Sequence, residues 1–132
     1  MITVTPRSFR RVLRARLRGS LVTGSDGRYE LRTILPGHYP NANIERHIHV
    51  HLTPAGLPEH WVESFFFDGD PKLTPAQIEA SRAAGAFHNI MQTKRDGSGV
   101  LQATRDFRID PAVAERNRLV DGWYRDDDHD AS

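Results

Sequence analysis

The sequence contains no cysteine. Neither a disulfide framework nor a thiolate metal site can therefore form, and zinc fingers and iron–sulfur clusters are excluded. A metal bound by this chain must take nitrogen and oxygen ligands. Seven histidines and three tyrosines are present, so these side chains are the first to consider as ligands.

Long apolar runs and a strong excess of charge are also missing. No run of about 18 apolar residues exists to cross a membrane, and the N-terminus lacks the apolar core of about 7 to 15 residues found in secretion signals. Lys and Arg number 18 and Asp and Glu 17, for a formal net charge of +1. This balance argues against dedicated nucleic-acid binding through bulk charge. We therefore expect a cytoplasmic protein that binds neither a membrane nor nucleic acid.

The length and composition predict one folded domain with charged ends. The 132 residues include 38% hydrophobic ones, enough for a single modest core. We expect a basic arm at residues 1–12, a domain at 13–124 and an acidic tail at 125–132. The arginine cluster at 7–18 is a weak indication to the contrary, because it could bind nucleic acid or a membrane surface. It fits a solvated arm, a short amphipathic helix or, as we favour, a strand from Leu13.

Several short strands separated by turn signals predict an all-β fold, an antiparallel β-sandwich with one or two short helices. Thr74 followed by Pro75 predicts a helix start, and Asp110 followed by Pro111 predicts another. Phe65–Phe67 is expected to form core and pocket wall. The expected strands cover residues 28–35, 44–53, 61–67, 87–92 and 100–109, and the expected helices run from 74 to about 84 and from 112 to about 120.

The stretch from residue 33 to 51, TILPGHYPNANIERHIHVH, gathers one tyrosine and several histidines. Because side chains alternate along a strand, His47, His49 and His51 are expected to project from one face. Neighbouring histidines of this set are about 6.5 to 7 Å apart at the backbone, which lets two rings close around one ion. The prolines and glycine of PGHYP predict a turn that brings Tyr39 to the same face. Without an ion, the same pattern fits a polar, solvated strand face.

These residues belong to a longer, ordered set of motifs. The set consists of LRGSLVTGSDGRYELRTILPGHYP from Leu17 to Pro40, HIH at His47–His49, FFFDGDP at Phe65–Pro71 and a last strand at Gly99–Ile109. In this order the motifs resemble those of the intradiol ring-cleavage dioxygenases, the non-haem iron(III) enzymes that open catechol or protocatechuate between the two hydroxyls. The resemblance covers roughly residues 17 to 110, and the combination of PGxYP, HIH and FxGDP is more specific than any one motif.

The resemblance implies an antiparallel β-sandwich that holds Fe(III). It implies Tyr39, His47 and His49 as iron ligands, and it implies that Tyr39 also accepts a proton from the substrate. The implied substrates are a catechol-type aromatic diol and O₂. The implied product is a muconate-type diacid, as in the catabolism of aromatic compounds.

The chain departs from the family pattern in two places. The family binds iron with two tyrosines and two histidines, and its other tyrosine lies upstream of the RG pair, where this chain has none. An N-terminus shorter than the family's is one explanation that the sequence leaves open. The family's arginine before HIH aligns with Ile44, so Arg46 is the candidate for stabilising substrate charge. On an unbroken strand, Arg46 would point to the face opposite His47.

A degenerate, non-catalytic β-sandwich relative or binding module is the main alternative, because one tyrosine is missing. A zinc hydrolase or lyase on His47, His49 and His51 is disfavoured, because the outer pair would be about 13 Å apart along the backbone. A cupin site lacks the glutamate expected four or five residues after His49. Asp68 and Asp70 fit turn chemistry better than a hard-cation site. The sequence leaves open a homo-oligomer and the identity of the aromatic substrate.

Overall fold

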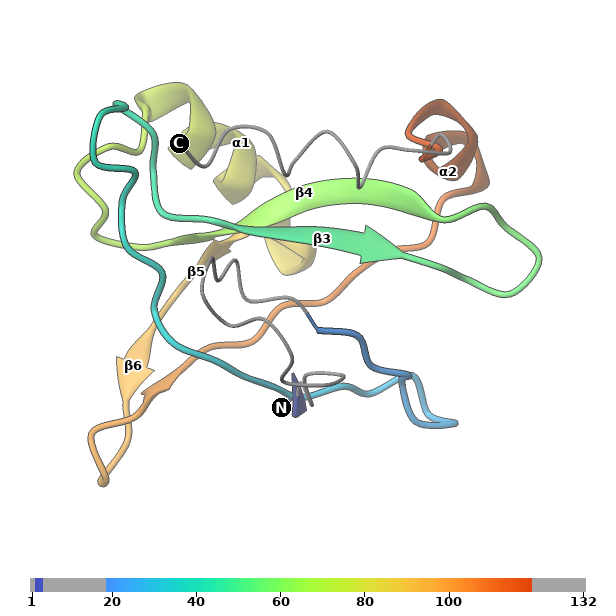
Figure 1. Cartoon of the computed structure of the whole chain (residues 1–132), viewed down its shortest axis with the longest axis horizontal. Coiled ribbons are helices and arrows are strands. Elements are labelled where there is room, and N and C mark those ends of the chain that lie inside the picture. Colours follow the sequence, from blue (N-terminus) through green and yellow to red (C-terminus); the bar gives the residue numbers. More distant parts are fainter. Residues whose placement is uncertain (1, 4–18, 120–132) are drawn as a thin grey trace. The chain divides into compact units, whose positions relative to one another are not determined.

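The computed structural model describes Ile2–Thr3 and residues 19–119 (Figure 1). These residues form mostly short strands in small sheets, together with two short α-helices and a 3-10 turn. The β-rich class predicted from the sequence is therefore confirmed. The described residues divide into two compact units between Leu35 and Pro36, and each unit is described by itself.

Several predicted features lie outside the described residues. They are most of the basic arm at 1–12, the strand expected from Leu13 and the acidic tail at 125–132. The last residue of the second predicted helix and Tyr124 lie there as well.

The first unit contains one small parallel sheet. Strand β1 (Ile2–Thr3) pairs with β2 (Leu31–Arg32). The strand predicted over 28–35 is thus reduced to two residues. Upstream of β2, Gly27 has a φ of 77° and its N–H donates to the carbonyl of Gly24 at 2.9 Å, which closes a tight turn that glycine tolerates without strain.

The main sheet of the second unit has the strand order β3-β4-β5. Strand β3 (Ile48–Leu52) runs antiparallel to β4 (His60–Phe67), and β5 (Ile90–Met91) pairs with β4 in parallel. The predicted strand over 61–67 is confirmed with one extra residue. The strand predicted from residue 44 begins four residues later, so His47 lies directly before it.

An irregularity in the β3–β4 pair lies beside the histidines. Val50 pairs with Val62 and Ile48 with Phe65, so two steps along β3 match three along β4. This extra residue on β4 is a β-bulge, which bends the strand locally. The bulge lies opposite His49.

The antiparallel prediction is wrong for β1–β2 and for β4–β5, which pair in parallel. Parallel neighbours need a crossover connection, and between β4 and β5 the chain supplies one in helix α1 (Pro75–Ala83). The remaining pair, β6 (Lys94–Arg95) with β7 (Leu101–Gln102), is an antiparallel hairpin.

Both predicted helix starts are confirmed. Thr74 caps α1 by accepting from the N–H of Gln77, whose side chain in turn accepts from the N–H of Thr74. Asp110 caps α2 (Pro111–Arg116), which is shorter than predicted. After α1 the chain forms a 3-10 turn at Gly85–Phe87, so the strand expected from residue 87 is wrong at its start.

The core of the second unit lies on the face of the β3–β4 pair opposite the histidines. Phe65 is buried, and its ring meets that of Phe107 edge to face at 5.9 Å. The guanidinium of Arg105 lies 4.8 Å from the ring centre of Phe65 and 4.4 Å from that of Phe107. The strand predicted over 100–109 is reduced to β7, and residues beyond it pack through these side chains instead of pairing.

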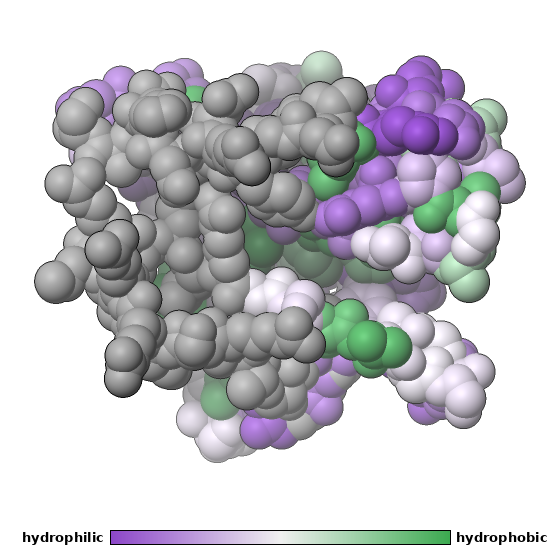
Figure 2. Space-filling view, turned by 45° about the vertical axis from the view of Figure 1, so that its right-hand side comes forward, coloured by the Kyte–Doolittle hydropathy of each residue, from purple (hydrophilic) through white to green (hydrophobic). Residues whose placement is uncertain are grey.

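Hydrophobic side chains remain at the surface in several separate places, among hydrophilic ones (Figure 2). Trp61, Ile78 and Ile109 are between 41% and 46% exposed. Within the described residues, no helix combines the length and the apolar character that crossing a membrane requires.

Candidate metal centre

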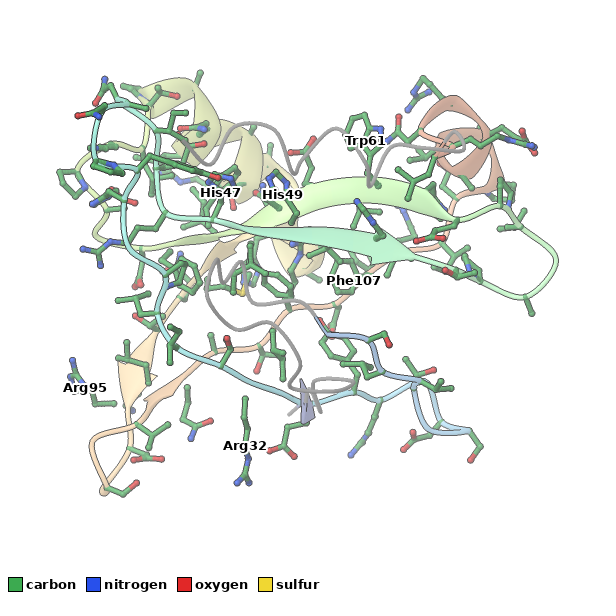
Figure 3. The ribbon with its side chains drawn as sticks, viewed as in Figure 1. Arg32, His47, His49, Trp61, Arg95 and Phe107 are labelled. Atoms are coloured by element: carbon green, nitrogen blue, oxygen red, sulfur yellow. The ribbon has the colours of Figure 1, made fainter. Side chains whose placement is uncertain are left out.

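The rings of Tyr39, His47 and His49 lie together in the second unit, and we call them the ring cluster. The ring centres of Tyr39 and His47 are 5.8 Å apart, and those of His47 and His49 are 4.7 Å apart. Tyr39 comes from the loop before β3, next to a turn at residues 40–41. Figure 3 shows His47 and His49 on the same side of β3 and Phe107 on the other side of the sheet, as strand alternation predicts.

The spacing of these rings fits the coordination of a single metal ion. A ligating imidazole nitrogen lies about 2 Å from its metal, so the ring centre lies about 3 Å from it. Two imidazoles whose metal–nitrogen bonds are at right angles to each other have ring centres about 4.5 Å apart. This is close to the 4.7 Å between the ring centres of His47 and His49. A phenol oxygen stands farther from its ring centre than an imidazole nitrogen does, which agrees with the longer distance to Tyr39.

Hydrogen bonds indicate which nitrogen each histidine presents. Nδ1 of His47 donates to the carbonyl oxygen of Glu45 at 2.9 Å, which assigns the free lone pair to Nε2. Nδ1 of His49 lies 3.4 Å from Oγ of Ser64. Metal-bound histidines usually donate their second ring N–H to a carbonyl or carboxylate, so His47 is oriented as a ligand would be.

A centre at this place is a mixed tyrosine and histidine site. Among residues 19–119, no group of three or more His, Cys, Asp or Glu side chains is arranged to hold a metal. Tyr39 is the only tyrosine among the described residues of the second unit. The ring cluster therefore contains the three side chains that the resemblance implies as ligands, and the family's second tyrosine has no counterpart among the described residues of the second unit.

Arg46 precedes the histidines and is half-buried. Its Nε is buried and has no hydrogen-bond partner within residues 19–119. A buried donor without a partner costs free energy, so this nitrogen fits a place where an anionic group binds. β3 begins at Ile48, so both Arg46 and His47 precede the strand. The role of Arg46 toward substrate charge stays a prediction.

The carboxylate of Asp70 joins the two segments that carry the ring cluster. Its side chain is only 1% exposed, and its Oδ1 accepts from Nε2 of His38 at 2.8 Å. Oδ2 accepts from the backbone N–H of Arg46 at 2.7 Å, and Oδ1 also accepts from the N–H of Lys72 at 2.9 Å. Each of these three contacts of the carboxylate is with a hydrogen-bond donor.

Asp68, the other carboxylate of this turn, also accepts hydrogen bonds, but from a different segment of the chain. Oδ1 of Asp68 accepts from the hydroxyl and the N–H of Thr93, at 2.6 and 3.2 Å. The two carboxylates thus organise the chain around the turn, as the sequence interpretation favoured over a hard-cation site.

The surroundings of Asp70 change its acidity. Burial by itself would raise the pKa of Asp70. The backbone N–H groups of Lys72 and Arg46 and the ring of His38 outweigh that effect and lower the pKa to about 2. The charged form is therefore the one that the fold stabilises.

This lowered pKa predicts a pH-dependent loss of stability in acid. Because the folded pKa lies below the unfolded value, the stabilisation is present above about pH 4 and is lost as the pH falls toward about 2. We expect the free energy of unfolding in urea to fall over this window. Asp70→Asn should flatten the fall, and Asp68→Asn, in the same turn, should flatten it less; equal profiles for all three proteins would contradict the assignment.

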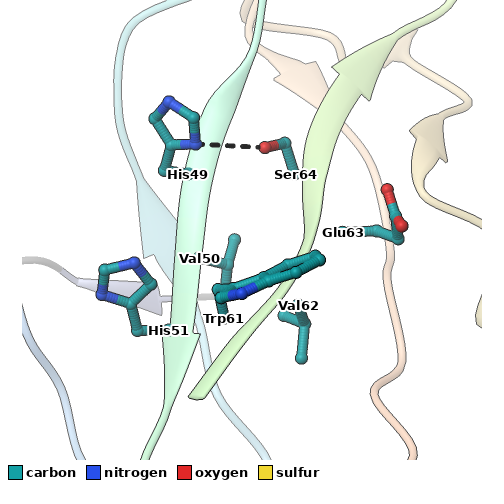
Figure 4. A pocket seen from close by; sticks show the side chains of 7 residues that line it. All are labelled: His49, Val50, His51, Trp61, Val62, Glu63 and Ser64. Atoms are coloured by element: carbon teal, nitrogen blue, oxygen red, sulfur yellow. Dashed lines mark hydrogen bonds between the residues drawn. The ribbon is translucent and has the colours of Figure 1, made fainter. Parts of the chain in front are cut away.

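An open groove adjoins the ring cluster on the histidine face of β3 and β4 (Figure 4). Its volume is about 240 Å³, and its lining includes His49, His51, Trp61 and Ser64. Benzene fits a cavity of roughly 150 Å³, so a single aromatic ring has room here. His49 belongs both to the ring cluster and to the groove.

Sequence reasoning missed two histidines with structural roles. His38 bonds to Asp70, which is 32 positions away in the chain, and no spacing rule connects the two. His60 is 1% exposed and its Nδ1 donates to the carbonyl of Pro58 at 2.9 Å. The alternation of β4 could have placed His60 on the face of Val62, the inward face of the sheet.

No family model matches the chain, and no solved structure matches it. The resemblance to the intradiol ring-cleavage dioxygenases therefore rests on the order of the motifs, and the geometry of the ring cluster is the structural observation beside it. Both observations concern the same residues, since PGHYP carries Tyr39 and HIH carries His47 and His49.

Proposed function

We propose that this chain is an intradiol ring-cleavage dioxygenase-like oxidoreductase that uses Fe(III) and O₂ to open a catechol-type aromatic diol to a muconate-type diacid. The observation that carries the proposal is the ring cluster. Tyr39, His47 and His49, which the motif resemblance implies as ligands, lie with ring centres 5.8 and 4.7 Å apart.

The donor set suits the proposed ion. Tyr39, His47 and His49 would hold it through one phenolate and two imidazoles, which are hard to borderline donors that iron accepts. When bound, ferric iron supplies a Lewis acid and redox centre that makes a catechol reactive toward O₂. The single negative charge from Tyr39 stabilises the ferric state less than the two tyrosinates of the family would.

The residues around the cluster have complementary tasks in this proposal. The Oη of Tyr39, on a side chain that is 44% exposed, is accessible to accept a proton from a catechol hydroxyl. The hydrogen bond to Glu45 would hold the ring of His47 in the orientation of a ligand. Trp61 gives the groove an aromatic wall for the substrate ring, and Arg46, directly before His47 in the chain, is the candidate for stabilising developing negative charge.

The β-sandwich fold belongs to the same proposal. Its support is the two-sided character of the β3–β4 pair, which carries the histidines on one face and packs Phe65 against Phe107 on the other. The parallel strand β5 would be a local addition to that architecture.

The spectrum of the iron-loaded protein tests the function. We expect protein purified without added metal to contain iron, to show a visible tyrosinate-to-iron(III) charge-transfer band and to consume O₂ with catechol. Tyr39→Phe should remove the band, because it removes the phenolate donor. His88→Ala is the control and should keep the band, because the ring of His88 bonds to the carbonyl of Gly85 instead.

Three outcomes separate the alternatives. An iron-loaded protein without a band, or a band that survives Tyr39→Phe, rejects the proposal. Stoichiometric iron with a band but without O₂ uptake favours the non-catalytic relative. A visible band that Tyr39→Phe removes, together with O₂ uptake, supports the enzyme.

A further inference from the structure

One buried carboxylate holds the neighbours of two proposed iron ligands. His38, which donates to Oδ1 of Asp70, directly precedes Tyr39 in the chain. Arg46, whose N–H donates to Oδ2 of Asp70, directly precedes His47. Asp70 therefore connects the start and the end of the loop that separates these two rings.

A second contact fastens the middle of the same loop. Nζ of Lys72 donates to the carbonyl of Ala42 at 2.9 Å, and the backbone N–H of Lys72 donates to Asp70. The loop has no strand pairing of its own between Tyr39 and His47. The conformation of this loop therefore depends on its hydrogen bonds with Asp70 and Lys72.

We propose that Asp70 is a positioning residue for the ring cluster, and that its carboxylate sets the separation of Tyr39 and His47 by holding His38 and the backbone of Arg46. The chemistry of the positioned rings rests on the proposed function. In this proposal Asp70 contacts neither substrate nor metal, so it acts on the rings through His38 and the backbone of Arg46.

The chemistry of a carboxylate explains why aspartate suits this position. An ionised carboxylate has two acceptor oxygens and no donor, so each oxygen can bind a different segment. Asparagine would replace one acceptor by an NH₂ group facing N–H donors, and alanine would leave the buried donors without a partner. A ligand loop held at both ends by one buried group is preorganised before any ion binds.

Four variants test this role. Asp70→Ala removes all contacts of the carboxylate. His38→Leu removes one contact and keeps Asp70, whereas His38→Gln keeps an N–H donor near the place of Nε2. Asp68→Ala is the matched control, because it disturbs the same turn through Thr93 and does not touch the loop.

Two readouts are needed. In the metal-free protein, a nuclear Overhauser effect between the ring protons of Tyr39 and His47 reports their proximity without any reference to activity. In the iron-loaded protein, a chelator competition reports affinity. We expect Asp70→Ala to lose the proton contact and about 10- to 100-fold of iron affinity, the range for groups that orient metal ligands. His38→Leu should lose about tenfold, and His38→Gln should recover most of it.

The outcomes separate positioning from function. Loss of the Tyr39–His47 contact in Asp70→Ala and His38→Leu, with the contact kept in His38→Gln and Asp68→Ala, supports positioning even if the wild type binds no iron. Contact and affinity unchanged in Asp70→Ala or His38→Leu, in a protein that unfolds cooperatively, overturn it, even if the charge-transfer band is present. Equal loss in Asp68→Ala assigns the effect to the stability of the turn and also overturns it.

Discussion

Replacing His47 by alanine is expected to abolish stoichiometric Fe(III) binding and with it the charge-transfer band. His47 is the central ring of the cluster, since its ring meets both that of Tyr39 at 5.8 Å and that of His49 at 4.7 Å. Without it, two donors remain, and no third is described beside them. We expect the affinity to fall by more than the roughly 100-fold upper range for groups that only orient ligands.

A histidine outside the cluster provides the control for this loss. His88 is half-buried in the second unit, and its Nδ1 donates to the carbonyl of Gly85 at 3.0 Å. His88→Ala should therefore bind iron as the wild type does. Chelator competition followed by visible absorbance measures both variants, and a His47→Ala protein that retains bound iron and its band would contradict the assignment of the centre.

Replacing Phe65 by alanine is expected to cost about 3 to 5 kcal/mol of unfolding free energy. Phe65 is one of the few large side chains buried in the described part of the chain. Its ring packs on Phe107 at 5.9 Å and under the guanidinium of Arg105 at 4.8 Å. Truncation therefore opens a cavity and removes one of the aromatic rings that contact this buried guanidinium. The total free energy of unfolding of a small domain is only about 5 to 15 kcal/mol, so the variant should be close to unfolded.

A second phenylalanine shows whether burial is the cause. Phe87 lies in the 3-10 turn, is 41% exposed and meets the guanidinium of Arg108 at 5.2 Å. We expect Phe87→Ala to cost no more than about 1 kcal/mol. Urea unfolding followed by circular dichroism compares the two variants, and equal losses would contradict the placement of the core around Phe65.

The elements that the sequence predicted well are those set by local chemistry. Thr74 and Asp110 form the helix caps that their positions before proline indicated, because a cap involves residues only two or three apart. Strand alternation predicted the face of β3 that carries His49, and His47, directly before the strand, lies on the same side. The prediction that PGHYP brings Tyr39 toward that face agrees with the observed ring distances.

The elements that it missed depend on partners far away in the chain. β5 pairs in parallel with β4 because α1 carries the chain across, and alternation within a strand does not reveal the direction of its neighbour. The strand expected over 100–109 shortened to β7, since most of it packs through side chains such as Arg105 rather than through backbone pairing.

By itself, the sequence determined the kinds of ligand that this chain can offer, the order of its motifs and the face on which His47 and His49 lie. These properties are local, because they follow from residue type and from the period of a strand. Only the tertiary structure decided that Asp70 meets both His38 and the backbone of Arg46. Such contacts depend on how loops close in space, and no local pattern of residues encodes that closure.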